Sequence, residues 1–183
     1  MLSVIEMELK AVLKNKLQVR EKLKKDGCKW VLVGRQEDTI YEKNDTLQVV
    51  QVPIFRIRKC DDNTNLTLKV LEKDVDTAEE LELSISDGTI MDKILQIIGF
   101  SIKVKIVKRR EITKYKGFNI CIDEVEGLGD FIEIERMSEK STDKNVVYQE
   151  IKKILFELGI EEQDLRKEKY YKMLLKKEEE LNE

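Results

Sequence analysis

The stretch that decides the fold of this 183-residue chain is "IEMELK", which runs from Ile5 to Lys10. Successive side chains of a β-strand point to opposite faces, so Ile5, Met7 and Leu9 share one face. The other face carries two acids and one base. Such a face is typical of a strand that looks at water, but it also suits a strand that lines a charged cavity. The residues on the polar faces of the other predicted strands are needed to distinguish these two interpretations.

Several further stretches alternate between apolar and polar residues in the same way. Turn-like segments separate several of them, and together they predict an antiparallel sheet with one apolar face. Helical periodicity instead marks residues 13–27, 87–100 and 143–160, and the tail 162–183 is also predicted to be helical. We therefore expect an α+β fold. The alternating stretches, in chain order, are "IEMELKA", "LQVVQV", "FRIRK", "LTLKVL", "ELELSIS", "IKVKIV", "FNICIDEV" and "FIEIER".

The apolar positions of two helical segments predict how they pack. Asp87 is a suitable capping residue for the segment 87–100. A single stripe on each segment is expected to face the sheet. The stripes are Met91, Ile94, Leu95 and Ile98 on the first segment, and Val147, Ile151, Ile154, Leu155 and Leu158 on the second.

Composition excludes several classes of protein. Charged residues make up 39% of the chain, yet 34 basic and 37 acidic residues leave a net charge of only −3, which argues against a nucleic-acid partner. No stretch is long and apolar enough to cross a membrane, and no signal peptide is evident. The three cysteines are far apart, which predicts free, mostly buried thiols in a cytoplasmic protein.

Histidine is absent from the sequence. This excludes histidine general bases, histidine-containing triads and histidine-ligated zinc or copper. Any chemistry must therefore use carboxylates, lysine, arginine, tyrosine or a metal ion held by oxygen atoms. Mg²⁺ or Mn²⁺ is the natural partner of such oxygen ligands.

A coarse repeat places paired acids on three predicted strands. Each pair has the form Glu-x-Glu, and each strand is followed by a helical segment that closes on a glycine: Gly27, Gly99 or Gly159. Units of this kind pack the apolar face of the strand against the helix. The paired acids are Glu6 and Glu8, Glu80 and Glu82, and Glu133 and Glu135.

Bases occupy the polar faces of other predicted strands. "FRIR" groups Arg56 with Arg58, and "LTLK" contributes Lys69. The strand that contains "KRR" is ambiguous, because the apolar residues of the preceding "VKI" share the face of Lys108 and Arg110. Paired arginines suit phosphate, and clustered carboxylates suit a divalent cation. A solvated sheet face and a cavity for a polyphosphate with a metal ion both remain open at this point.

The motifs, taken together, resemble the CYTH superfamily, the triphosphate tunnel metalloenzymes. "EMELK" fits the family's ExExK signature. "RQEDTIY", "FRIR", "LTLK", "ELELSISD" and "KRR" follow in the family's order, and "IDEVEGLGDFIEIE" is similar to the class IV adenylate cyclase branch. The resemblance implies one CYTH-type domain over residues 1–183, with 162–183 as a C-terminal helical tail. It also implies an eight-stranded antiparallel β tunnel with a polar lumen, flanked by helices.

The resemblance further implies a role for each charged residue of the tunnel. A nucleoside or inorganic triphosphate would lie along it with Mg²⁺ or Mn²⁺, and a homodimer is possible. The implied metal ligands are Glu6, Glu8, Glu133 and Glu135. The implied phosphate contacts are Lys10, Arg56, Arg58, Lys69, Lys108 and Arg110. The implied catalytic acids are Glu8, Asp123, Glu80 and Glu82.

Three functions follow from these expectations. The first is a cyclase that converts ATP to cyclic AMP and pyrophosphate, and the second is an inorganic or thiamine triphosphatase. The third is a non-catalytic polyphosphate or nucleotide sensor. Near the end of the chain, Tyr170-Tyr171 stands where the family often has Ser-Tyr. Lys169 could close the tunnel there, although a lysine in a Lys/Glu-rich tail is more often solvated, and we take that as the expectation.

Overall fold

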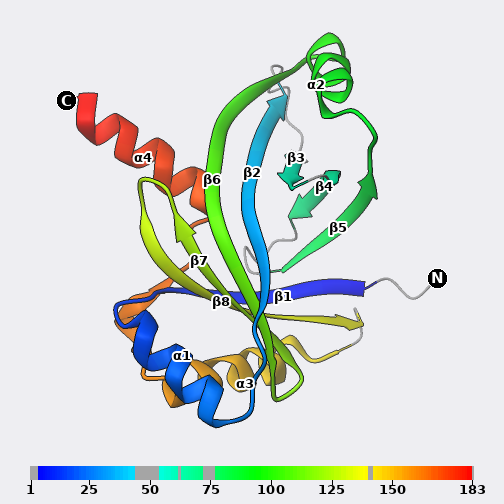
Figure 1. Cartoon of the computed structure of the whole chain (residues 1–183). Helices are drawn as coiled ribbons and strands as arrows, with labels where there is room; N and C mark the ends of the chain where they lie inside the picture. The colour runs from blue at the N-terminus through cyan, green and yellow to red at the C-terminus, as the bar shows by residue number, and fades with distance from the viewer. Residues whose placement is uncertain (1–3, 44–53, 62, 72–76, 140–141, 183) are drawn as a thin grey trace.

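The computed structural model describes residues 4–43, 54–61, 63–71, 77–139 and 142–182. Strands and helices follow one another along this part of the chain as Figure 1 shows. The strands are β1 (Val4–Val12), β2 (Val31–Lys43), β3 (Ile54–Cys60), β4 (Asn63–Leu71), β5 (Thr77–Ser84), β6 (Phe100–Tyr115), β7 (Phe118–Val125), β8 (Gly129–Glu139) and β9 (Leu165–Arg166). The helices are α1 (Lys16–Lys25), α2 (Gly88–Ile97), α3 (Lys144–Glu157) and α4 (Tyr170–Asn182), with a short 3₁₀ turn at Glu162–Asp164.

The nine strands form one antiparallel sheet in the order β5-β4-β3-β2-β6-β7-β8-β1-β9. A short pairing of β1 with β5, through Glu6 opposite Ala78 and Met7 opposite Thr77, brings the two sides of this order together. Eight strands therefore follow one another around a common interior. This confirms the predicted antiparallel tunnel flanked by helices.

The three strands that carry the Glu-x-Glu pairs are neighbours in space. β8 pairs with β1 along its length, and β1 pairs with β5. α1, α2 and α3 follow these strands, and each is closed by a glycine with a positive φ, between 82° and 92°. Glycine adopts this left-handed conformation without the steric cost of a side chain. The coarse repeat of the sequence thus places three pairs of acids on neighbouring strands of the tunnel.

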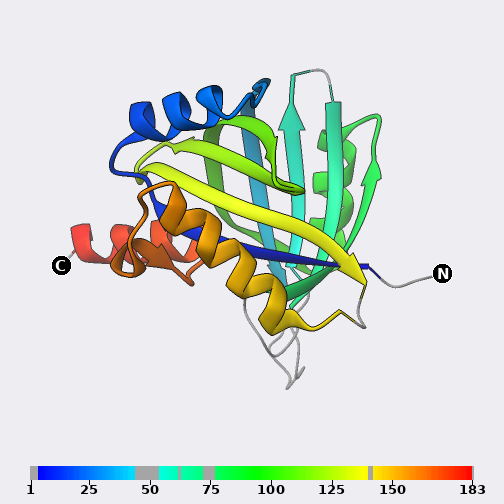
Figure 2. The same ribbon diagram turned by 90° about the horizontal axis from the view of Figure 1, so that it is seen from below.

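The main core lies outside the tunnel, between the sheet and two helices. Figure 2 shows α3 lying across β1 and β8. The apolar face of "IEMELK" contributes Ile5 and Met7, both fully buried. All five apolar residues predicted for 143–160 are buried against them, which confirms that stripe. One face of β1 therefore packs in the core, and its charged face points into the tunnel.

α2 covers a smaller core on the outer face of β3, β4 and β6. The Asp87 carboxylate accepts hydrogen bonds from the backbone N–H groups of Thr89 and Ile90, as the predicted cap requires. Leu95 is buried, but Ile94 and Ile98 of the predicted stripe are exposed. That part of the prediction is wrong, because a short helix buries a narrower stripe than its apolar residues would cover. Leu81 and Leu83 of β5, expected to pack against a helix, are exposed as well.

Two further segments differ from the prediction. Residues 31–43 form the long strand β2, although their sequence shows no simple alternation. The tail is not one helix: β9 pairs with β1 through Arg166 opposite Lys10, and α4 begins only at Tyr170. The predicted strand "LQVVQV" (residues 47–52) lies outside the described residues. Among the described residues, no helix combines the length and apolar character that a membrane crossing requires.

Candidate active site

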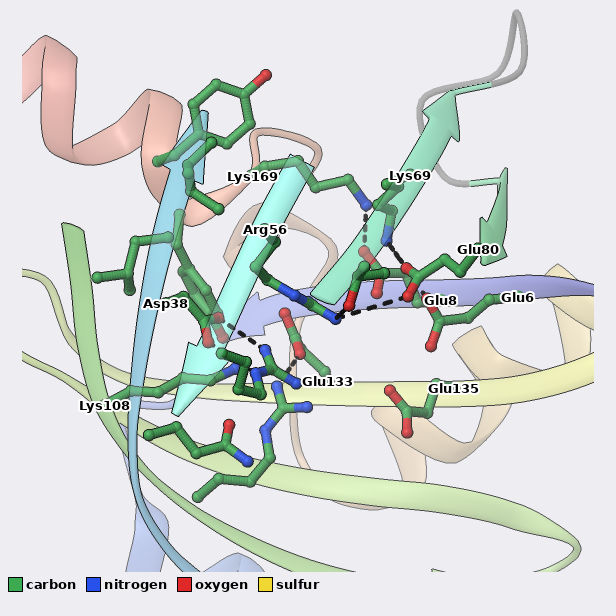
Figure 3. A pocket seen from close by; sticks show the side chains of 18 of the residues that line it. Glu6, Glu8, Asp38, Arg56, Lys69, Glu80, Lys108, Glu133, Glu135 and Lys169 are labelled. Carbon is green, nitrogen blue, oxygen red and sulfur yellow. Dashed lines mark hydrogen bonds and ion pairs between the residues drawn. The ribbon is translucent and has the colours of Figure 1, made fainter. Parts of the chain in front are cut away.

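The tunnel encloses a cavity of about 440 Å³. The charged faces of the strands line it, which decides between the two interpretations of "IEMELK" in favour of the cavity. Figure 3 shows how acids and bases from different strands meet there. The charged residues of its wall are Glu6, Glu8, Lys10, Asp38, Arg56, Arg58, Lys69, Glu80, Glu82, Lys108, Arg110, Glu133, Glu135 and Lys169. Of the predicted site residues, Asp123 alone does not belong to the described lining.

Bases and their counter-acids occupy one side of the cavity. Arg58 donates two hydrogen bonds of 2.7 Å to the carboxylate of Asp38, its partner across β2 and β3. Arg110 forms the same kind of bidentate pair with Asp123, at 2.6 and 2.5 Å. Lys108 donates to the same Asp123 carboxylate at 2.8 Å. These bonds hold the three bases in fixed positions before any ligand arrives.

The buried acids on this side are ionised because the bases surround them. Burial alone would raise the pKa of Asp38, but the hydrogen bonds and charge of Arg58 lower it to about 2. The pKa of Asp123 is lowered against the effect of burial by Arg110 and Lys108. Glu133 follows the same rule, since Arg110 and three nearby lysines, Lys108, Lys10 and Lys169, outweigh burial and lower its pKa. Asp123 is completely buried behind the bases it holds.

A cluster of three carboxylates occupies the other side. Glu6 and Glu8 of β1 and Glu135 of β8 each place an oxygen atom within 4.8 Å of the other two. Glu8 and Glu135 are direct cross-strand partners. We call these three residues the carboxylate cluster.

Burial, together with the neighbouring charges, changes the pKa values of this cluster. Burial raises the pKa of Glu6 to about 8, with Glu80, Glu8 and Glu135 adding to the rise and Lys69 opposing it. Burial also raises the pKa of Glu135. Burial and Glu133 act in the same direction on Glu8, but Lys169 and Lys69 outweigh them and lower its pKa. The cluster therefore contains more acid than its neighbouring bases neutralise.

The carboxylate cluster fits a hard divalent cation. Mg²⁺ and Mn²⁺ prefer oxygen ligands, and the three carboxylates converge closely enough to share one ion. A bound cation would also offset the burial and the carboxylate repulsion that together raise the pKa of Glu6 and Glu135. Glu133, the fourth predicted ligand, is engaged elsewhere: it pairs with Arg110 and lies 3.8 Å from Lys10. Its role as a ligand stays a prediction.

On the wall between the two sides, lysine and arginine side chains form ion pairs with glutamates. Lys69 pairs with Glu80 and lies 3.4 Å from Glu6. Arg56 lies 3.7 Å from Glu80 and 3.6 Å from Glu82. Glu82 is the most exposed of these acids, and it accepts a hydrogen bond of 2.9 Å from the Thr67 hydroxyl. Glu80 and Glu82 thus hold bases of the wall in place.

An apolar surface forms one end of the cavity wall. The lumen faces of β2, β3 and β6 change from charged to apolar residues in the same direction. Ile40 follows Asp38 on β2, Ile54 precedes Arg56 on β3, and Ile106 precedes Lys108 on β6. The three isoleucines belong to one cluster that also contains Tyr170 and Tyr171. This change explains why the predicted faces of the "KRR" strand were ambiguous: both kinds of residue face the lumen.

Sequence reasoning missed several residues of the wall. Asp38 and Gln36 lie on the unrecognised strand β2, where the order Gln-x-Asp was the available signal. Tyr170 belongs to the lining, with no local pattern to show it. The expectation that Lys169 is solvated is wrong, since its ammonium pairs with Glu8 and the side chain is only 19% exposed. Figure 3 shows Lys169 reaching toward Glu8.

Fold and site together define a class of protein: a β tunnel in which fixed bases face a cluster of carboxylates. A family model of the CYTH domain matches residues 4–170, so the chain belongs to the CYTH family. The family consists of metal-dependent enzymes that act on triphosphates. The protein is 34% identical over 172 residues to "Putative adenylate cyclase MJ0240" of Methanocaldococcus jannaschii, which covers 93% of this chain and 98% of that protein.

Solved structures show the same fold. The PH1819 protein of Pyrococcus horikoshii has a TM-score of 0.76 and 30% identity over 94% of this chain and 99% of that chain. A more distant structure is that of the "putative adenylyl cyclase HpAC1" of Hippeastrum, for which a dominant triphosphatase activity is reported. It has a TM-score of 0.55 and 18% identity over 86% of this chain and 88% of that chain.

Proposed function

We propose that this protein is a metal-dependent enzyme that converts ATP to cyclic AMP and pyrophosphate. The observation that carries the proposal is the division of the cavity, with fixed bases on one side and a carboxylate cluster on the other. A triphosphate with a divalent cation presents the complementary arrangement, anionic oxygens beside a positive ion. The 34% identity to a protein named "Putative adenylate cyclase" supports the same reaction.

The bases would bind and neutralise the triphosphate. Arg58, Lys108 and Arg110 are already oriented by Asp38 and Asp123, so little reorganisation is needed when charge develops on the phosphate oxygens. Such preorganised charge is commonly the largest contribution to phosphoryl-group transfer. Arg56 adds a further indication, because its buried Nε atom has no hydrogen-bond partner among the described residues. A phosphate oxygen would satisfy it.

Glu6, Glu8 and Glu135 would hold Mg²⁺ or Mn²⁺, which would supply positive charge at the phosphate and favour ionisation of the attacking group. Glu8 is also the proposed acceptor of the proton from the ribose 3′-hydroxyl. Asp123 lies behind Lys108 and Arg110, so we propose that it positions these bases rather than touches the substrate. Glu80 and Glu82 would act in the same way on Lys69 and Arg56.

The bond changes of the proposed reaction are those of an intramolecular displacement. The ribose 3′-oxygen forms a bond to the α-phosphorus, and the bond from the α-phosphorus to the oxygen that bridges to the β-phosphorus breaks. Pyrophosphate carries away the electron pair, and the 3′-hydroxyl proton passes to the carboxylate. The arginines and lysines stabilise the charge that accumulates on the leaving group.

The apolar end of the cavity supports a substrate with an organic group. Ile40, Ile54 and Ile106 offer no hydrogen bonds to an inorganic triphosphate, but they can pack against a planar base. Gln36, whose buried Oε1 lacks a hydrogen-bond partner among the described residues, offers a polar contact on the same wall. These features favour a nucleotide over inorganic triphosphate.

The second candidate is a triphosphatase, in which water attacks the terminal phosphorus and orthophosphate leaves. The activity reported for HpAC1 supports it only as a reaction that this fold can host. The same bases and carboxylates would serve both reactions. The difference lies in the attacking oxygen and in which phosphorus it reaches.

Product identification tests the proposal. The purified protein is incubated with Mg²⁺ or Mn²⁺ and, separately, with ATP, inorganic triphosphate and thiamine triphosphate, and the products are separated. Cyclic AMP with an equal amount of pyrophosphate is the expected result. Orthophosphate without cyclic AMP would replace the cyclase by the triphosphatase. Binding of triphosphate without any turnover would replace both by a sensor.

A matched pair of variants makes this assay specific for the site. Glu135→Gln removes one carboxylate of the cluster, whereas Glu124→Gln removes an exposed carboxylate that pairs with Lys16 at 3.2 Å outside the tunnel. Activity that belongs to this protein is lost in the first variant and kept in the second. Activity that survives in both would not depend on the carboxylate cluster.

A further inference from the structure

Tyr170, the first residue of α4, lies between two of the bases. The ammonium of Lys10 is 4.3 Å from the centroid of its ring, and that of Lys108 is 5.2 Å away. The Tyr170 hydroxyl donates a hydrogen bond of 3.1 Å to Asp123. The side chain lines the cavity, and the residue is only 7% exposed. A single aromatic side chain thus contacts both lysines and the acid that anchors one of them.

The ring has a physical effect on the two lysines. Ammonium groups are attracted to the negative face of an aromatic ring, and the attraction is strongest where water is excluded. Lys10 needs such a contact, because its ammonium lies 3.8 Å from Glu133, which is beyond hydrogen-bond distance. Lys10 and Lys108 also repel one another. The ring attracts both ammonium groups, so they can lie close together without using up their hydrogen-bond donors.

Two contacts hold the ring itself in place. The edge of Phe131 packs against it with the ring centroids 5.1 Å apart. The bond to Asp123 fixes its hydroxyl end, and Asp123 is in turn fixed by Arg110. The orientation of Tyr170 is therefore tied to the same acid that orients Lys108 and Arg110.

We propose that Tyr170 is a positioning residue that sets Lys10 and Lys108 for the triphosphate. Its ring holds the two ammonium groups toward the cavity, and the hydrogen bond from its hydroxyl to Asp123 fixes the orientation of the ring. It acts through the lysines and not on the reacting atoms. This inference rests on the proposed function only in taking a triphosphate as the ligand.

Four variants separate the ring from the hydroxyl and from the docking of α4. Tyr170→Phe keeps the ring, and Tyr170→Leu removes it. Pentafluorophenylalanine at position 170 keeps the shape of phenylalanine but reverses the charge distribution of the ring face. Leu174→Ala weakens the docking of α4, since Leu174 packs in the same apolar cluster and against Gly127 but is not part of the described cavity lining.

Binding of inorganic triphosphate to the metal-free protein, measured by calorimetry in EDTA, is the readout. We expect Tyr170→Leu and the fluorinated variant to bind about ten-fold more weakly than wild type, as the loss of two buried cation–π contacts requires. Tyr170→Phe should restore binding to within about three-fold, because it keeps the ring face. Leu174→Ala should lower the melting temperature without changing the affinity. In turnover assays, Tyr170→Leu and the fluorinated variant should raise KM more than they lower kcat.

The outcomes separate this inference from the proposed function. If wild type binds triphosphate neither in EDTA nor in the presence of Mn²⁺, the proposed function fails and this inference fails with it. If wild type binds only in the presence of Mn²⁺, the variants are compared under that condition with the same expected order. If wild type binds and the fluorinated variant binds equally well, the positioning role alone is overturned. Equal weakening in Tyr170→Leu and Leu174→Ala would also overturn it, because α4 docking would then be the cause. The fluorinated variant conserves volume, so it decides the question even if Tyr170→Leu does not fold.

Discussion

The two sides of the cavity treat charge in opposite ways. On the side of β2, β3 and β6, bases surround the buried acids, and the pKa values of Asp38 and Asp123 are lowered. On the side of β1 and β8, the carboxylates crowd one another, and the pKa values of Glu6 and Glu135 are raised. On the first side, the buried acids and bases already neutralise one another without a ligand. On the second side, burial and mutual repulsion both disfavour the ionised carboxylates, and a bound cation would offset both effects.

The difference follows from which strands are neighbours. Where β6 pairs with β7, Arg110 stands opposite Asp123, so opposite charges meet in register. Where β1 pairs with β8, Glu8 stands opposite Glu135, so like charges meet. Like charges directly opposite one another destabilise a sheet. The protein keeps this arrangement at the position where it would serve metal binding.

The largest expected effect is on turnover. Glu8→Gln and Glu135→Gln should each lower metal-dependent activity by about 1,000-fold, because each removes a proposed ligand of the ion that neutralises the phosphate. Steady-state kinetics across a range of Mn²⁺ concentrations checks this. Glu124→Gln, at an exposed ion pair outside the tunnel, should behave like wild type. Full activity in either cluster variant would remove the carboxylate cluster from the mechanism.

The second prediction concerns Asp123 and the side of the cavity where bases and acids are paired. Asp123→Asn should lower the free energy of unfolding by about 3 to 4 kcal/mol, because it leaves Arg110 and Lys108 buried without their shared anion. Urea denaturation at pH 7 measures it. Asp130→Asn is the control, since that acid forms a more exposed pair with Lys16 and should cost less than about 1 kcal/mol. Equal losses in the two variants would mean that Asp123 does not anchor the bases.

The third prediction is a substitution in the carboxylate cluster that stabilises the protein, whereas Asp123→Asn destabilises it. Glu6 has a pKa raised from 4.5 to about 8, so its ionised form is disfavoured in the folded protein. Stability is therefore lost as the pH rises from about 4.5 through 8. Glu6→Gln avoids this loss and should stabilise the metal-free protein by about 2 to 3 kcal/mol at pH 9, with little difference near pH 4.5. Urea denaturation in EDTA at the two pH values checks it, and a difference that does not depend on pH would contradict it.

The sequence predicts those parts of this arrangement that depend on neighbouring residues. The Glu-x-Glu pairs were placed correctly on the polar faces of their strands because period-two alternation separates Glu6 from Met7, whichever strand lies beside them. That these faces line a lumen was implied only by the family resemblance. The cap at Asp87 was found for the same reason, since it depends on the next three residues alone. Local chemistry is sufficient for both.

The remaining features depend on the whole fold. β2 could not be recognised because its outward residues Arg35 and Glu37 are exposed and charged, while its lumen face is also polar at Gln36 and Asp38. Alternation is then lost. Lys169 pairs with a residue 161 positions away, so only the return of the chain across the tunnel mouth could show it. The contacts of Tyr170 depend on the same return.

The smallest expected effect concerns Lys169 and tests whether the carboxylate cluster binds a cation. Lys169 pairs with Glu8 through side chains that are largely buried, so Lys169→Met should cost about 1 kcal/mol of stability in the metal-free protein. The same lysine competes with a metal ion for Glu8. Without triphosphate, the variant should therefore bind Mn²⁺ a few-fold more tightly than wild type, which calorimetry can measure. Lys167→Met, at an exposed position of the same segment, should change neither the stability nor the Mn²⁺ affinity.

Weaker Mn²⁺ binding in Lys169→Met would show that Lys169 supports metal binding at the carboxylate cluster instead of competing with the metal ion for Glu8. The difference in charge balance between the two sides of the cavity would then be smaller than their pKa values indicate.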